Sequence, residues 1–134
     1  MKNSHSCFII AEIGVNHNNS MTLAKKLISE AKKAGADAVK FQTFKADTLA
    51  LKKTPKVPYQ KRSGHKEETH HSMLKKLELS EKNHLLIQKI CKKNNIEFIS
   101  TPYDLESAIF LSKIGVKKFK IASADIVDHQ MHNY

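Results

Sequence analysis

Short apolar runs alternate with amphipathic segments along most of the chain, and this alternation predicts strands followed by helices. Four runs are apolar at consecutive positions and have the length of strands buried on both faces. Three segments repeat apolar residues every three or four positions, as helices with one buried face do. We expect strands near residues 8–13, 37–42, 97–101 and 118–122, and helices near 21–34, 81–94 and 104–114.

The expected helices carry recognisable end signals. Ser20, Ser80 and Asp104 stand just before them, where a side-chain oxygen can accept a hydrogen bond from a free backbone N–H. Gly35 and Gly115 follow two of them, as glycines in left-handed C-terminal caps do. The helix boundaries are therefore predicted by two independent signals, periodicity and capping.

A long polar connection, residues 44–72, interrupts the regular pattern. It contains Pro55, Pro58 and Gly64, and only one short helical stretch is expected, near Met73. Connections of this length inside a compact domain are usually functional or disordered. We expect this segment to be a long loop that follows the second strand.

The order of strands and helices predicts an α/β fold with parallel strands. Right-handed crossovers allow either an open doubly wound sheet or a closed barrel. The turn after the first strand, GVNHNN at residues 14–19, lacks the glycine pattern of a dinucleotide-binding sheet. A barrel needs eight strand–helix units in roughly 250 residues. The chain has 134 residues and about four units, so as a barrel it would be an N-terminal portion, truncated at its C-terminus.

The composition indicates a basic protein with free thiols. The net charge is +10, but the lysines are spread along the chain, which favours a solvated surface. We expect no nucleic-acid partner, because no basic–aromatic motif is present. Cys7 and Cys91 lack metal-type spacing and lie beside apolar residues, so we expect buried free thiols in a reducing compartment. No signal-peptide core or membrane-length apolar run is found, which predicts a cytoplasmic protein without a membrane partner.

Polar residues follow each expected strand, where active sites of parallel α/β folds lie. Two lysines and two hydroxyls suit a phosphate and a carboxylate, and two acids can position water, a hydroxyl or a metal. For any one residue, a solvated strand end is the simpler interpretation, but four such strands in succession favour a site. The residues are Glu12 with Asn16 and His17, Lys40 with Gln42, Ser100 with Thr101, and Lys120 with Ser123 and Asp125.

Four motifs stand in order at these strand ends: IAEIGVNH at 10–17, KFQT at 40–43, FISTP at 98–102 and KIASAD at 120–125. Together they resemble the N-terminal barrel motifs of the sialic acid synthase family, which includes synthases of N-acetylneuraminic, legionaminic and pseudaminic acids. The sequence around Tyr59 and residues 73–79 is more similar to the legionaminic branch. The resemblance runs from about residue 8 to residue 125.

The resemblance implies that residues 1–134 form the N-terminal portion of a (β/α)₈ TIM barrel, with about four strand–helix units. It also implies a reaction of cell-surface carbohydrate biosynthesis. Phosphoenolpyruvate condenses with an N-acylated hexose, N-acetylmannosamine or a legionaminic-type analogue, to give a nine-carbon keto sugar acid. Carried over by motif, Glu12 and Asp125 are catalytic, Lys40, Thr101, Lys120 and Ser123 bind phosphoenolpyruvate, and Gln42, Tyr59 and Gln60 bind the sugar.

The resemblance further implies a divalent metal, Mn²⁺ by expectation, and a homodimer for the full-length parent. The family's metal-binding histidines lie in the second half of the barrel, so we expect no metal ligands in this chain. The loop residues His65, Glu67, His70 and His71 show no zinc-type spacing and are interpreted as solvated. Two alternatives stay open: a non-catalytic half barrel that binds or oligomerises, and a nucleic-acid binder suggested by charge alone.

Overall fold

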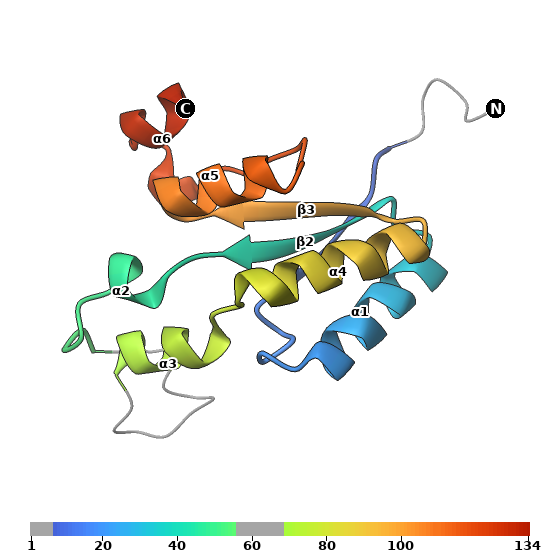
Figure 1. Ribbon diagram of the computed structural model, residues 1–134, viewed down its shortest axis with the longest axis horizontal. Coiled ribbons are helices and arrows are strands. Elements are labelled where there is room, and N and C mark those ends of the chain that lie inside the picture. The colour runs from blue at the N-terminus through green and yellow to red at the C-terminus, as the bar shows by residue number, and fades with distance from the viewer. Residues whose placement is uncertain (1–6, 56–68) are drawn as a thin grey trace.

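The structure is a computed structural model that describes residues 7–55 and 69–134. Strands and helices alternate around one small sheet (Figure 1). In chain order the elements are β1 (Ile10–Gly14), α1 (Met21–Lys33), β2 (Ala38–Thr43), α2 (Ala46–Leu49), α3 (His70–Leu77), α4 (Glu81–Lys93), β3 (Glu97–Pro102), α5 (Leu105–Lys113), the 3₁₀ turn η2 (Ser123–Asp125) and α6 (His129–Asn133).

The three strands form a parallel sheet in the order β1-β2-β3. Glu12 pairs with Lys40 across β1 and β2, and Gln42 pairs with Thr101 across β2 and β3. Three expected strands are thereby confirmed within two residues at each end. Parallel neighbours in chain order require crossover helices, which α1 and α4 provide.

The fourth expected strand, near 118–122, is wrong as a regular strand. The segment makes a single parallel bridge, between Ser100 and Phe119, and the Lys120 N–H donates to the Ser100 carbonyl over 3.3 Å. Among the described residues it has a strand neighbour on one side only. Phe119 and Ile121 are correspondingly exposed, so neither hydrogen bonds nor packing extend the pairing.

The helix ends follow the predicted signals. Ser20, Ser80 and Asp104 each accept a hydrogen bond from a backbone N–H in the first turn of α1, α4 and α5. Gly35 and Gly115 have φ angles of 87° and 82°, in the left-handed region that favours glycine. The expected helices 21–34, 81–94 and 104–114 are confirmed to within one residue at each end.

The main core lies between α1, α4 and one face of the sheet. Ile13, Val39, Phe41 and Phe98 point to this face and pack with Ile28 of α1 and Ile87 of α4, all of them buried. Figure 1 shows α1 and α4 side by side along the strands. The other sheet face carries Glu12, Lys40, Gln42 and Thr101, because alternate strand residues point to opposite sides.

The start of β1 is more exposed than its apolar sequence predicted. Phe8, Ile9 and Ile10 are 49%, 54% and 45% exposed, and Cys7 is exposed, whereas Cys91 is buried as expected. The reason is position: β1 is an edge strand of the described sheet, with β2 as its only strand neighbour there. Whether an apolar run is buried depends on strands and helices elsewhere in the sequence, which the run itself does not reveal.

A second, smaller apolar cluster holds α2 and α3 at the carboxyl ends of the strands. Phe44, Ala46 and Leu74 form its buried centre, and Val15 and Tyr103 pack against it. The backbone N–H of His70 donates to the Thr54 carbonyl over 2.9 Å, which joins the two ends of the long connection. Helix α2 falls inside the expected loop and was not predicted.

None of the helices in the described ranges is long and apolar enough to cross a membrane.

Candidate active site

Three polar side chains from three strands meet on the open face of the sheet. The Lys40 ammonium contacts the Glu12 carboxylate and donates to Thr101 Oγ1 over 3.2 Å. Lys40 is largely covered, with 15% of its side chain exposed, whereas 49% of the Glu12 side chain is exposed. A lysine so covered needs polar partners, and the strand register supplies one from each neighbouring strand.

A bulge in β1 directly follows Glu12, which itself stands opposite Lys40. The pairing with β2 shifts between Glu12 and Gly14, so that one extra residue stands opposite Phe41. Gly14 has a φ of 56°, and a Cβ added there would lie 3.0 Å from Glu12 Oε1 and 3.6 Å from Gln42 Nε2. Bulges commonly re-aim side chains beside functional sites. The positive φ favours glycine at this position, and a Cβ there would also require the end of the Glu12 side chain to shift.

Ser100 does not join the group on the open face, although it precedes Thr101. It points to the helix side of the sheet, where its hydroxyl lies 2.7 Å from Thr43 Oγ1. Thr43 Oγ1 in turn lies 2.9 Å from His84 Nε2, and all three side chains are buried. The carboxyl ends of β2 and β3 therefore carry one polar group on each face.

His17 is a loop-ordering residue on the helix side. Its Nδ1 accepts a hydrogen bond from the Asn19 N–H over 2.9 Å, and its ring stacks at a tilt on Phe41, 5.8 Å between centroids. Burial, together with nearby His84, lowers the pKa of His17. The ring thus holds the turn after β1 in place, on the side of the sheet away from Lys40.

Lys120, Ser123 and Asp125 lie on the segment after α5 and are not bonded to the first group. Lys120 Nζ donates to the Ile121 carbonyl, and within the described residues neither Lys120 nor Ser123 hydrogen bonds to Glu12, Lys40 or Thr101. Asp125 Oδ2 is buried without a partner in that part of the chain. Burial and the nearby Asp128 carboxylate raise the pKa of Asp125, while His132 opposes the shift.

Comparison with known proteins places this arrangement in a family. The sequence model of the NeuB family matches residues 27–134, which is more than half of the chain. The chain belongs to the NeuB family. It is 52% identical over 125 residues to the N,N'-diacetyllegionaminic acid synthase of Legionella pneumophila, covering 93% of this chain and 35% of that protein. It is 49% identical over 120 residues to the Campylobacter jejuni enzyme of the same name, covering 90% of this chain and 36% of that protein.

A solved NeuB-type structure agrees with the fold. The N-acetylneuraminic acid synthetase of Leptospira borgpetersenii, in complex with citrate, superposes with a TM-score of 0.73 at 35% identity. The match covers 92% of this chain and 39% of that one. The chain is thus an α/β fragment that matches the N-terminal part of a synthase TIM barrel. It spans about a third of the length of the curated NeuB-family relatives it matches.

The metal implied by the family was tested against the residues present. Among the described residues no group of three or more histidine, cysteine, aspartate or glutamate side chains could hold a metal ion. His71 instead pairs with Asp47 over 2.8 Å and helps join α3 to α2. Tyr59, Gln60, His65 and Glu67 lie outside the described residues. The described part of this NeuB-family chain does not fit a metal.

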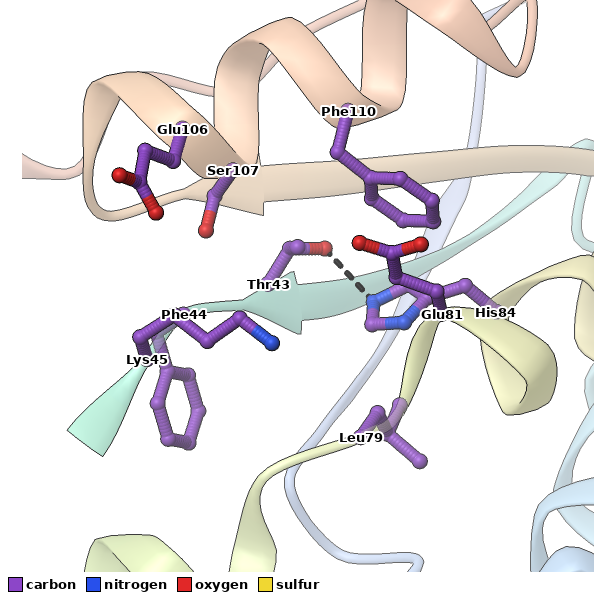
Figure 2. Close-up of a pocket in the computed structure, with 9 residues that line it drawn as sticks. All are labelled: Thr43, Phe44, Lys45, Leu79, Glu81, His84, Glu106, Ser107 and Phe110. Atoms are coloured by element: carbon purple, nitrogen blue, oxygen red, sulfur yellow. Dashed lines mark hydrogen bonds between the residues drawn. The ribbon is translucent and has the colours of Figure 1, made fainter. Parts of the chain in front are cut away.

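A small pocket lies on the helix side of the sheet rather than on the Lys40 face. Its volume is about 60 Å³, room for roughly two waters. Figure 2 shows Thr43 and His84 pointing toward one another at its base, with Phe110 above them. Its lining residues are Thr43, Phe44, Lys45, Leu79, Glu81, His84, Glu106, Ser107 and Phe110.

Sequence reasoning missed Thr43 and His84 as partners. One signal was available: His84 lies on the apolar stripe of the expected helix 81–94, one helical turn before Ile87 and two turns before Cys91. A histidine on a buried face needs hydrogen-bond partners. The sequence does not reveal which strand residue supplies them.

Proposed function

We propose that this chain supplies part of the active site for condensing phosphoenolpyruvate with an N-acylated hexose. The acceptor is N-acetylmannosamine or a legionaminic-type analogue, and the product is a nine-carbon keto sugar acid. The observation that carries the proposal is the contact of Lys40 with both Glu12 and Thr101 on the open sheet face. The names of the similar synthases support it.

Lys40 and Thr101 suit the anionic groups of phosphoenolpyruvate. A covered ammonium with a hydroxyl 3.2 Å away offers a charge and several donors to a phosphate or carboxylate. Lys120 and Ser123 are proposed to join them by movement of the segment after α5, which is exposed at both residues. The four residues would then neutralise and orient the substrate.

Glu12 and Asp125 are proposed to act on the reacting atoms. The C3 carbon of phosphoenolpyruvate bonds to the aldehyde carbon, and the aldehyde oxygen takes a proton. Water then adds at C2, and phosphate leaves as its C2–O bond breaks. Glu12 is half exposed and can orient that water as a carboxylate acceptor. Asp125 is proposed to donate a proton to the aldehyde oxygen, and burial and the nearby Asp128 carboxylate shift its pKa upward, the direction that suits a donor.

Gln42, Tyr59 and Gln60 are proposed to contact the sugar or its acyl group. Gln42 lies on the same sheet face as Lys40, two residues further toward the carboxyl end. In the full-length parent we further propose a divalent metal, held outside the described residues, and a homodimer. A metal in such sites polarises a carbonyl oxygen.

The test is binding of phosphoenolpyruvate to the 134-residue chain, followed by ³¹P NMR of the substrate phosphate. We expect saturable binding that pyruvate, which lacks the phosphate, competes for poorly. Binding of both compounds with equal affinity would remove the phosphate role from this face. No binding of either would refute the proposed site.

A second candidate function is a non-catalytic half barrel that binds or oligomerises. Exposed Ile10 on the edge strand β1, with exposed Phe8 and Ile9 just before it, favours this function, because such edges pair readily with other chains. Sedimentation equilibrium separates the two candidates. A tight dimer that does not bind phosphoenolpyruvate would favour the second function over the first.

A further inference from the structure

The buried hydrogen bonds behind the sheet form a directed chain. His84 Nδ1 lies 3.0 Å from the Ser80 carbonyl, which can only accept, so Nδ1 carries the proton. In the neutral ring Nε2 then accepts, and Thr43 donates to it over 2.9 Å. The Thr43 oxygen is left to accept from the Ser100 hydroxyl, 2.7 Å away. Each donor and acceptor in the chain thus has one assigned role.

This chain of hydrogen bonds links the first turn of α4 to the ends of β2 and β3. Thr43 follows Gln42, and Ser100 precedes Thr101, so each network residue adjoins a residue of the candidate site. Thr43 stands opposite Pro102, not opposite Ser100, which makes the Thr43–Ser100 bond diagonal across the strands. A slip of one strand along the other would stretch this diagonal bond or compress it below its 2.7 Å, according to the direction of the slip. The bond therefore opposes a register slip, which would move the site residues to the wrong face.

The surroundings keep the ring of His84 neutral. His84 is 2% exposed and meets the ring of Phe110 edge-on, with 5.4 Å between centroids. Burial, and to a smaller degree Lys45, lower its pKa, while the Ser80 carbonyl and Glu81 oppose the shift. Buried His17, the Cys91 thiol on α4 and the pocket residue Glu106 are further titratable groups on this side. A protonated Nε2 would reverse the direction of every hydroxyl in the chain.

We propose that His84, acting through Thr43 and Ser100, is a positioning residue that fixes Gln42 and Thr101 in register on the opposite face of the sheet. The inference deepens the proposed function and rests on it only for the identity of the ligand. The hydrogen bonds among His84, Thr43 and Ser100 touch no substrate atom, since they lie on the helix side of the sheet. Its effect on binding is exerted through the strand ends.

The experiment uses two amides of the same strand pair. The Tyr103 N–H donates to the Thr43 carbonyl over 3.0 Å at the carboxyl end, and the Glu97 N–H donates to the Asp37 carbonyl over 3.0 Å at the other end. In Thr43→Val, which removes the hydroxyl at nearly constant shape, we expect Tyr103 exchange to rise about tenfold and Glu97 exchange to stay unchanged. Equal acceleration of both amides would mean general destabilisation and would overturn the proposal.

Two further variants act as rescue and control. Thr43→Ser keeps the hydroxyl and should restore slow exchange at Tyr103. Ser107→Ala removes a buried hydroxyl across the pocket that takes no part in these hydrogen bonds, and it should leave the amide exchange rate of Tyr103 unchanged. Affinity for phosphoenolpyruvate should fall about tenfold in Thr43→Val and recover in Thr43→Ser. If the unmodified chain does not bind phosphoenolpyruvate, the proposed function fails, while the amide comparison still decides the positioning role.

The tautomer of His84 gives a readout that does not require a variant to fold. At pH 7 the imidazole ¹⁵N spectrum should show a protonated Nδ1 and an unprotonated Nε2. A protonated Nε2 at that pH would contradict the assigned direction of the chain and overturn the proposal.

Discussion

Replacing Lys40 with methionine should weaken phosphoenolpyruvate binding more than it weakens the fold. Methionine keeps the apolar stem and removes only the ammonium, which contacts Glu12 and Thr101. One hydrogen bond to a charged group is worth about 1.5–3 kcal/mol, which corresponds to roughly ten- to a hundredfold in affinity. We therefore expect the dissociation constant for phosphoenolpyruvate to rise by that factor.

The cost to folding should be small. The Glu12 side chain is 49% exposed and stays hydrated without its partner. Ion pairs with one such exposed member contribute at most about 1 kcal/mol. Loss of the donor to buried Thr101 Oγ1 adds about 1 kcal/mol, so the free energy of unfolding, measured with urea, should fall by no more than about 2 kcal/mol.

The assay is a phosphoenolpyruvate titration followed by ³¹P NMR, run beside urea unfolding of the same preparations. Lys89→Met, at an exposed lysine on α4, is the matched control and should change neither quantity. An unchanged dissociation constant in Lys40→Met would refute the placement of the substrate on this face. A loss of binding that tracks a large loss of stability would refute the separation of site from fold.

Three other outcomes are expected. Iodoacetamide should modify exposed Cys7 at pH 8 and spare Cys91 until urea is added, because burial raises the pKa of the Cys91 thiol to about 12. Peptide mass spectrometry measures the labelling of each cysteine. Labelling of Cys91 before urea is added would contradict the expectation. The urea midpoint should fall between pH 7.5 and pH 5.5, since burial lowers the pKa of His17 and His84, so the unfolded chain binds more protons once the pH drops below about 6.5. A urea midpoint that rises as the pH is lowered from 7.5 to 5.5 would show that the two rings are not buried in their neutral form. Finally, the 134 residues alone should release no phosphate from phosphoenolpyruvate and N-acetylmannosamine with manganese added, because the described residues contain no cluster able to hold the metal; turnover that Glu12→Ala abolishes would contradict this.

Local signals predicted the regular elements of the fold well. The caps at Ser20, Ser80 and Asp104 act within one helical turn, so the sequence around each is sufficient to locate them. The run at 118–122 failed because a strand needs partners, and only the bridge at Phe119 formed. Helix α2 was missed because it is four residues long and depends on Glu78, which accepts from the Ala46 N–H over 3.0 Å from 32 residues away.

The candidate site was predictable in part. Glu12, Lys40 and Thr101 were found because parallel strands bring their carboxyl ends together, whatever the details of packing. The partnership of Thr43 with His84 was not, because 41 residues separate the two and no local pattern links them. Lys120 and Ser123 were expected beside Lys40, but their position depends on a segment with few hydrogen bonds to the sheet.

The separate apolar cluster under α2 and α3 has a consequence for how chain length varies in this part of the molecule. Because the His70 N–H donates to the Thr54 carbonyl, the two described ends of the intervening segment lie next to each other. Loop-closure entropy grows only slowly with the number of residues, by about 0.6 kcal/mol for each doubling. Insertions and deletions between 54 and 70 should therefore leave Lys40, Gln42 and the main core undisturbed. Evolution can lengthen or shorten the chain between Thr54 and His70 without rebuilding the barrel strands.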